Sequence, residues 1–310
     1  MTTTIKISFV FCFLAAWLWS DLAHGQQDPL FSQYYFNPLS INSGYAGARN
    51  SLNATFIARE QWVGAEGRPR THAFSMHTPL KNESLAFGFN FMRDQVGPVQ
   101  TTAVAADIAY RFQVSKKARL ALGLKGGVNM FAAALSELEN TDPNDLAFAQ
   151  NLQNTPLPNF GVSAYWWSEE FFLGLSAPRL VENPIETGTD MIQNQERRHF
   201  FLMGGYTFPM SRDLKFQPTF LTRYVAGAPL SIDLNANFYI HEWLWLGASA
   251  RFGDSFGLIA AFRVSDQFRI GYSFDFQTNQ LVNYSPGSHE FMMSYDIQFG
   301  KHKLKYPCWN

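Results

Sequence analysis

The chain repeatedly alternates large apolar residues with small or polar ones over stretches of about ten residues. In residues 268–277, the large members are Phe268, Ile270, Tyr272, Phe274 and Phe276, and the others are Arg269, Gly271, Ser273, Asp275 and Gln277. Residues 84–94 and 291–300 repeat the pattern. A period of two places successive side chains on opposite faces of a β-strand. The pattern therefore predicts strands with one large apolar face and one face of small or charged residues.

Two folds can use such strands, a soluble sandwich and a transmembrane β-barrel. Aromatic residues make up 16% of the chain, including 30 Phe, while charged residues reach only 16%, against about 25% in soluble domains. The second face is rich in Gly, Ala and Ser with single charges, which suits a crowded, wet lumen. Because the pattern recurs so often, we expect an all-β protein, a transmembrane antiparallel β-barrel with its rings facing lipid.

Fourteen segments carry the pattern, and most have about 9–11 residues, enough to cross a bilayer at a tilt. An even count is the rule in closed bacterial barrels. The segments are 52–60, 71–79, 84–94, 100–112, 118–131, 159–167, 169–176, 198–208, 213–222, 230–240, 243–251, 255–263, 267–276 and 289–299. After residue 25, no uninterrupted run of about 18 apolar residues predicts a membrane-spanning helix.

The lengths of the connections follow the same alternation. Every second connection is short, and the two longest, 135–158 and 177–197, both fall in the other set. Outer-membrane barrels have short periplasmic turns and longer extracellular loops. We therefore expect the short turns to be periplasmic and the long loops to be extracellular.

The first 25 residues have the features of a secretory signal peptide: a lysine, an apolar run from Ile7 to Trp19, and a small-x-small cleavage pattern. The expected organisation is a signal peptide (1–25), a periplasmic N-terminal segment or plug (26–51), an outer-membrane barrel (52–299) and a periplasmic tail (300–310). The expected location is the outer membrane, as a multi-pass protein after signal cleavage. Cys12 leaves with the signal, so Cys308 has no partner for an internal disulfide.

Residues 31–47, FSQYYFNPLSINSGYAG, are aromatic but interrupted by proline and glycine, so they form no helix or central strand. Without a hydrogen-bonded ladder, the segment cannot lie free in hydrocarbon. It is either a packed plug or arm in the periplasmic mouth or lumen, or a loosely held arm. The candidate plug or partner-binding residues are Phe31, Tyr34, Tyr35, Phe36, Asn37, Pro38, Asn42 and Tyr45.

Charged residues on the small faces are expected to point into the lumen, since a lipid-facing charge costs about 2–4 kcal/mol near the midplane. They either bind a ligand or partner, form a conductance filter, or brace the wall as ion pairs. The candidates are Arg59, Asp107, Arg111, Lys125, Asp233, Arg251, Arg263, Arg269, Asp275 and Asp296. Trp166, Trp167 and Trp243 lie beside short turns, which predicts an interfacial girdle.

Nothing in the sequence indicates an enzyme, a metal site or a cofactor. The histidines of the mature chain have no motif that fixes a nucleophilic serine beside them, and no Cys pair or helical His-x-x-x-His is present. With 24 Lys and Arg against 25 Asp and Glu, no basic patch predicts binding to nucleic acid.

The start of the mature chain resembles the PorP/SprF family of the type IX secretion and gliding machinery of Bacteroidota. The resemblance lies in QDPLFSQYYFNPLSINSGYAG (27–47), ARNSLNATFIAREQW (48–62), RTHAFSMHTPL (70–80) and SLAFGFNFMRDQVGP (84–98). It is strongest over residues 26–131, and Asn42-Ser43-Gly44 replaces the family's usual N-P-A before Tyr45.

This resemblance implies a partner-dependent barrel rather than a simple pore. The implied function is to anchor or help display type IX secreted proteins, such as an adhesin-type C-terminal domain, or to link the secretion and gliding machinery to the outer membrane. The expected partners are outer-membrane lipid, a secreted protein with a type IX sorting domain, and a periplasmic peptidoglycan-binding lipoprotein. The alternative is a general, porin-like solute channel, which requires a continuous wet path through the lumen.

Overall fold

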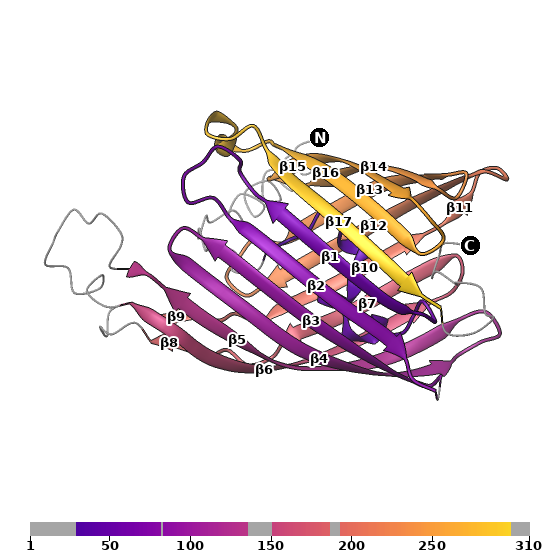
Figure 1. Ribbon diagram of the computed structural model, residues 1–310, viewed down its shortest axis with the longest axis horizontal. Helices are drawn as coiled ribbons and strands as arrows, with labels where there is room; N and C mark the ends of the chain where they lie inside the picture. The colour runs from indigo at the N-terminus through magenta and orange to yellow at the C-terminus, as the bar shows by residue number, and fades with distance from the viewer. Residues whose placement is uncertain (1–28, 82, 136–150, 187–192, 299–310) are drawn as a thin grey trace, which may run out of the picture.

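The computed structural model describes residues 29–81, 83–135, 151–186 and 193–298, and it is a β-barrel (Figure 1). The predicted signal peptide and tail, and parts of both long loops, lie outside these residues. The strands are β1 Leu52–Glu60, β2 Arg70–Pro79, β3 Leu85–Val96, β4 Val99–Gln113, β5 Arg119–Ala133, β6 Leu152–Trp167, β7 Phe171–Arg179, β8 Pro184–Glu186, β9 Gln193–Gln195, β10 His199–Tyr206, β11 Phe208–Pro209, β12 Leu214–Val225, β13 Ser231–Ile240, β14 Leu244–Arg251, β15 Ser255–Arg263, β16 Phe268–Gln277 and β17 Ser288–Ile297.

Fourteen of these strands form a closed antiparallel ring, which confirms the predicted fold class. Each strand pairs with its neighbours in sequence order, and β10 pairs with β12. The ring closes between the first and last strands, from Leu52 opposite Ile297 to Glu60 opposite His289. The two-residue β11 only extends the pairing of β12, and β8 and β9 form a separate hairpin. Closure pairs the backbone of every wall strand on both sides, as hydrocarbon requires.

The two faces of the wall differ as the alternation requires. On the outer face, the apolar side chains of Phe291 and Leu258 are 58% and 52% exposed, so they are available for contact with lipid. On the inner face, Ser273 and Ser294 are buried. Among the described residues, no helix is long and apolar enough to cross a membrane.

The two ends of the barrel have different connections. One end, called the turn end below, contains the start of β1, the end of β17 and the short links 80–84, 114–118, 168–170, 207–213, 241–243 and 264–267. The other, called the loop end, contains the connections 61–69, 97–98, 134–151, 180–198, 226–230, 252–254 and 278–287. Within 278–287 lies a short 3-10 helix, η6, Gln280–Asn283.

Aromatic pairs follow the outer rim of the turn end. Trp166 packs edge-on against Phe171 with ring centroids 4.7 Å apart, and Trp243 stacks on Phe262. Further pairs are Tyr110–Phe112, Tyr206–Phe208, Phe216–Phe238 and Phe268–Tyr295. This rim has the amphipathic rings of a membrane-interface girdle.

Trp167 is not part of this rim, so its assignment to the girdle was wrong. Its side chain is buried in the lumen, with its ring 5.5 Å from Tyr165. Adjacent residues of one strand point to opposite faces. Since Trp166 faces outward, Trp167 must face inward.

A charge on the lipid face tests the assignment of the two faces. Leu258 lies in the middle of β15 with its side chain exposed. Replacing Leu258 with Arg should lower the free energy of unfolding by about 2–4 kcal/mol, because the guanidinium would lie in hydrocarbon. The measurement is urea unfolding of the protein in lipid vesicles, with Leu258→Met as the control. Equal stability of the two variants would contradict a lipid-facing position.

Candidate functional site

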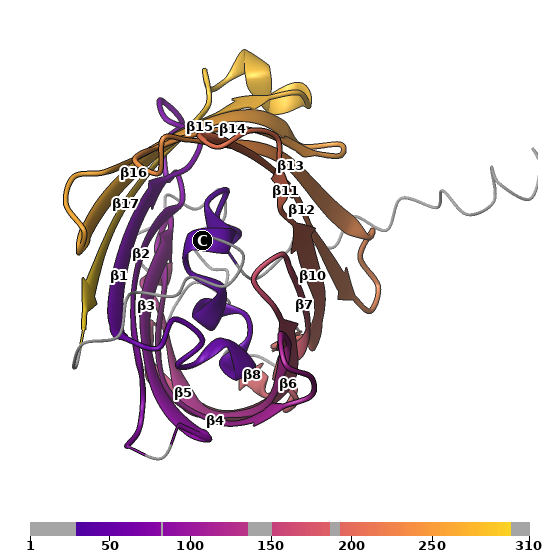
Figure 2. The same ribbon diagram turned by 90° about the vertical axis from the view of Figure 1, so that its right-hand side faces the viewer.

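The candidate site is the barrel lumen together with residues 29–51, called the lumen segment below (Figure 2). Every residue from Phe31 to Arg49 is buried except Ser40, which is half-buried. The segment contains three single 3-10 turns, η1 Tyr34–Phe36, η2 Pro38–Ser40 and η3 Ser43–Tyr45. It has the burial of a protein core, although it contains no regular helix or strand.

The local sequence of the lumen segment explains its short turns. Pro38 occupies the first position of η2, where its missing N–H is not needed. The side chain of Asn42 accepts a hydrogen bond from the backbone N–H of Gly44 at 3.0 Å, which caps η3. Such turns satisfy backbone groups locally and leave the aromatic side chains free to point in several directions.

Near the loop end, one arginine and two acids of the wall hold the start of the lumen segment. Arg59 lies 2.8 Å from Asp275 and 2.9 Å from Glu290. The backbone N–H groups of Ser32 and Gln33 donate to Glu290 at 3.0 and 2.8 Å. The Ser32 hydroxyl also donates to Asp275 at 2.6 Å. The segment therefore supplies hydrogen bonds that two buried carboxylates need.

At the turn end, an ion pair holds the other end of the lumen segment. Arg49 lies 3.2 Å from Asp296, and both side chains are buried. Ser51 and Asn53 also donate to Asp296, at 3.2 and 2.9 Å. Tyr45 accepts a hydrogen bond from the Nε of Arg49 at 3.0 Å. Since its start is held near the loop end and its end at the turn end, the segment runs through the length of the lumen.

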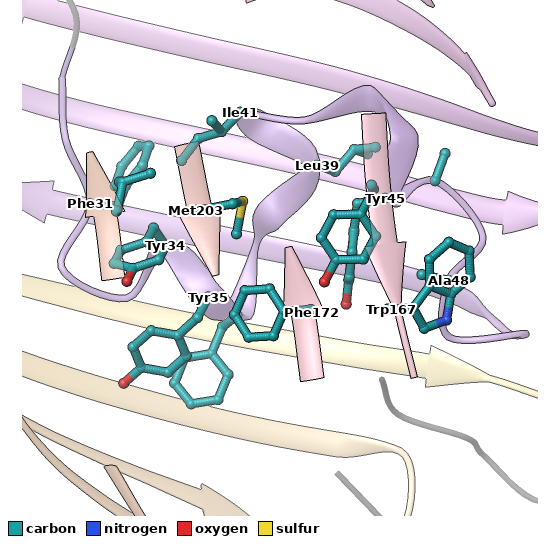
Figure 3. Close-up of a cluster of buried hydrophobic side chains, with 14 of the residues drawn as sticks. Phe31, Tyr34, Tyr35, Leu39, Ile41, Tyr45, Ala48, Trp167, Phe172 and Met203 are labelled. Carbon is teal, nitrogen blue, oxygen red and sulfur yellow. The ribbon is translucent and has the colours of Figure 1, made fainter. Parts of the chain in front are cut away.

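Between these anchors, the rings of the lumen segment pack against several strands (Figure 3). Tyr35 stacks on Trp245 of β14 with ring centroids 5.6 Å apart, and Tyr45 packs edge-on against Tyr165 of β6 at 5.3 Å. The Tyr34 hydroxyl donates to Thr219 of β12 at 3.1 Å. The contacts thus reach several sides of the ring, as expected of a plug.

A glycine of the wall makes room for the third turn. A Cβ atom built on Gly123 of β5 would lie 2.2 Å from the backbone nitrogen of Gly44 and 2.5 Å from the carbonyl carbon of Ser43. No larger residue fits there without moving backbone, because real Cβ contacts are longer than 3.0 Å. The wall and the segment are therefore complementary in shape at this position.

All the candidate residues of the aromatic segment lie inside the barrel. Their side chains are buried, and the residues are Phe31, Tyr34, Tyr35, Phe36, Asn37, Pro38, Asn42 and Tyr45. The Asn42 side chain donates to the backbone oxygen of Ala164 at 3.0 Å, and Asn37 accepts from Ser75 at 2.6 Å. These side chains are therefore packed inside the barrel, against the wall and one another.

The structure brings some of the candidate charges together. Asp107 lies 3.0 Å from Lys125, Asp233 lies 2.7 Å from Arg251, and Asp275 pairs with Arg59 as described. The other candidates contact different groups. Arg111 donates to the backbone oxygens of Gly47 and Glu83.

The last three candidates lie at different depths. Asp296 holds Arg49, and the guanidinium of Arg269 lies 5.7 Å from the ring centre of Phe36. Arg263 is at the turn-end mouth, 3.7 Å from the exposed Glu242. The lumen charges thus mainly contact one another and the lumen segment.

Several charged residues of the lumen, such as Arg223 on β12, were not predicted from the sequence. Glu290 lies on the inward face of β17, and the alternation of that strand with Met292 and Asp296 could have identified it. Arg49 precedes β1, outside any strand pattern. Glu196 lies in the 180–198 connection, where it accepts from Asn129 at 2.6 Å and from Asn183 at 2.7 Å. No periodic pattern in the sequence marks Arg49 or Glu196.

At least two cavities lie beside the lumen segment among the described residues. One has a volume of about 130 Å³ and lies between the segment and the wall formed by β2 to β7 and β10. Another has about 570 Å³, lies at the loop end, and is lined by residues such as Trp62, Leu230 and Phe252. In the described part of the chain, no group of three or more His, Cys, Asp or Glu residues could hold a metal ion.

Comparison with known protein families identifies the family of this chain. A family model described as type IX secretion system membrane protein PorP/SprF matches residues 23–295. The chain belongs to the PorP/SprF family. This is a family of secretion-system membrane proteins and not an enzyme family. A search of curated proteins found no relative that matches the chain.

Solved structures of outer-membrane barrels share the fold of this PorP/SprF protein. The CymD monoaromatic hydrocarbon channel has a TM-score of 0.50 at 12% identity, over 90% of this chain and 96% of its own. The Ralstonia pickettii toluene transporter TbuX has a TM-score of 0.51 at 6% identity, over 84% of this chain and 92% of its own. At such low identity, these similarities establish the fold alone.

The close approach at Gly123 generates a prediction with a matched control on the same strand. Gly123→Ala should displace η3 and lower the free energy of unfolding by about 1–3 kcal/mol, as overpacking does. Gly126→Ala should change the free energy of unfolding by less than about 0.5 kcal/mol, because its Cβ would lie 4.0 Å from the nearest side chain, Phe160. Denaturant unfolding measures both, and limited proteolysis reports whether the segment becomes accessible. Two variants of equal stability and protease resistance would refute the packing described here.

Proposed function

We propose that this protein is a non-enzymatic outer-membrane barrel that anchors type IX secreted proteins, or assists their surface display, and links the secretion machinery to the membrane. The observation that carries the proposal is the lumen segment, which is buried from Phe31 to Arg49 and held by ion pairs or carboxylates at both ends. A barrel filled by its own chain is suited to present surfaces at its two ends rather than to conduct.

The anchors of the lumen segment argue against an open pore. A general solute channel needs a continuous wet path. To open such a path, the segment would have to leave Glu290, Asp275 and Asp296, which are buried carboxylates. Removing one partner of a buried charge pair costs about 3–5 kcal/mol, so spontaneous opening would be rare.

The loop end offers a surface for a protein partner. Among the described residues of its connections, four large apolar side chains are more than half exposed: Leu230, Phe252, Val282 and Tyr284. Exposed apolar and aromatic groups are typical of interaction sites. The short turns and long loops favour an extracellular loop end, where a secreted adhesin-type domain would be held. In this arrangement the turn end faces the periplasm and a peptidoglycan-binding lipoprotein.

The second candidate function is a solute channel, and the two cavities favour it. Pro29 and Leu30 line both, so the larger cavity at the loop end borders the smaller one inside the lumen. CymD is described as a monoaromatic hydrocarbon channel and TbuX as a toluene transporter. These cavities would become a path only if the lumen segment moved.

The test is affinity purification of the tagged protein from its native outer membrane in mild detergent, followed by mass spectrometry. We expect a secreted protein with a type IX sorting domain, or a periplasmic lipoprotein, in stoichiometric amount. Phe252→Ser should reduce the bound secreted protein at least tenfold, whereas Val264→Ser, an exposed apolar residue in a turn-end link, should not.

Two outcomes would contradict the proposal. The first is a barrel purified alone that also conducts ions in planar bilayers, which would favour the channel. The second is equal retention of the secreted protein by Phe252→Ser and Val264→Ser, which would remove the loop end as its docking surface.

A further inference from the structure

The smaller cavity is a mainly apolar space between the lumen segment and the wall. On the segment side it is lined by Leu30, Phe31 and Ile41, and the last two are visible in Figure 3. On the wall side it is lined by Met92, Ala103 and Ala105. Its volume of about 130 Å³ is close to that of an engineered apolar cavity, about 150 Å³, that stays dry and binds benzene. The cavity therefore suits an apolar group about the size of benzene.

Most polar groups that line this cavity already have partners. Lys125 and Asn90 both contact Asp107. Asn129 and Asn159 both donate to Glu196, at 2.6 and 3.4 Å. These groups therefore do not need a hydrogen-bond partner in the cavity.

The side-chain amide of Asn37 is different. Its oxygen accepts from Ser75 at 2.6 Å, but its nitrogen, Nδ2, has no hydrogen-bond partner among the described residues. Asn37 is 3% exposed and lines the cavity. A buried donor without a partner costs about 1–3 kcal/mol, so the structure leaves a polar group that an acceptor could satisfy.

We propose that this cavity is a binding site for a small neutral molecule with a benzene-sized apolar body and one hydrogen-bond acceptor. The body packs between Phe31, Ile41 and the small side chains of β4, and the acceptor faces the Asn37 amide. A neutral molecule fits better than an anion, because Asp107 already pairs with Lys125. Burial of an apolar body supplies the affinity, and the amide supplies the selectivity.

The position of the site determines how a ligand enters it and how ligand binding affects the lumen segment. Pro29 and Leu30 also line the larger cavity at the loop end, so the ligand enters from that side, past the start of the lumen segment. A ligand that touches both the segment and the wall binds only when the segment is in place. It therefore stabilises the plugged state, and above the dissociation constant this stabilisation rises with the logarithm of the ligand concentration.

Benzyl alcohol is a suitable probe. Toluene has a similar apolar body but no hydrogen-bond acceptor, so it is the matched control compound. Isothermal titration to the purified full-length protein in detergent should show saturable binding of benzyl alcohol. The affinity for benzyl alcohol should exceed that for toluene by about five- to tenfold, the value of one hydrogen bond. The melting temperature should rise with the concentration of benzyl alcohol.

Two neighbouring alanines on β4 provide a matched pair. Ala105 lines the cavity, whereas Ala106 is exposed on the lipid face. Ala105→Leu should fill the cavity and weaken binding at least tenfold, while Ala106→Leu should bind as the wild type does. Asn37→Leu is close to asparagine in size and removes the amide, so it should abolish the preference for benzyl alcohol over toluene.

Three results would overturn the proposal. Equal binding by Ala105→Leu and Ala106→Leu would mean that the probe only partitions into detergent or the lipid-facing surface. Equal affinity for toluene and benzyl alcohol in the wild type would mean that Asn37 does not recognise the acceptor. No saturable binding of benzyl alcohol would mean that water alone occupies the cavity and satisfies Asn37.

Discussion

The backbone amides of this chain must be paired within the wall, because hydrocarbon offers them no other partner. Closing β1 on β17 meets that requirement and removes both sheet edges. Closure of fourteen strands has a second consequence. About eight strands enclose a space that wall side chains can fill, and sixteen to eighteen enclose an aqueous channel. A fourteen-stranded ring whose inner face is rich in Gly, Ala and Ser therefore leaves a wide lumen, and residues 29–51 occupy it.

The buried charges determine where the lumen segment lies. Arg59 sits between Asp275 and Glu290, and these acids also receive donors from Ser32 and Gln33. Such a cluster contributes little net stability, because desolvation offsets much of the attraction. Its effect is on specificity, since any other position of the segment would leave buried carboxylates with fewer donors. With Arg49 on Asp296 at the opposite end, the segment has one favoured register along the lumen axis.

The wall of this protein could be predicted closely from its sequence. The range 52–60, for example, is the same in prediction and structure, because the alternation that marks a strand is also what inserts it into the membrane. The range 159–167 was too short, since β6 begins at Leu152 and passes through Pro156 and Pro158. Prolines are tolerated where the missing N–H faces away from the neighbouring strand. Here the Pro158 oxygen accepts from Asn183 on the side opposite β5.

The contents of the lumen could be predicted only in part. The aromatic composition and the breaks at Pro38 and Gly44 indicated a segment that needs a covering surface. They carried no information about which wall residues it meets, because those contacts join residues far apart in the chain. Asp296 is 247 positions from Arg49. The close approach of Gly44 to Gly123 depends on backbone positions that no local pattern determines.

Residues 29–51 should fill the lumen in the native membrane, and a disulfide between this segment and the wall tests that position most directly. The hydroxyl oxygens of Ser43 and Ser163 lie 2.7 Å apart, close enough for paired cysteines. Ser43→Cys with Ser163→Cys, with Cys12→Ala and Cys308→Ala to remove the native thiols, should cross-link fully on mild oxidation of outer membranes. Ser43→Cys with the outward-facing Val162→Cys should not. Mass spectrometry of the joined peptide identifies the bond. Free thiols at 43 and 163 in the folded barrel would show that the segment does not occupy the lumen.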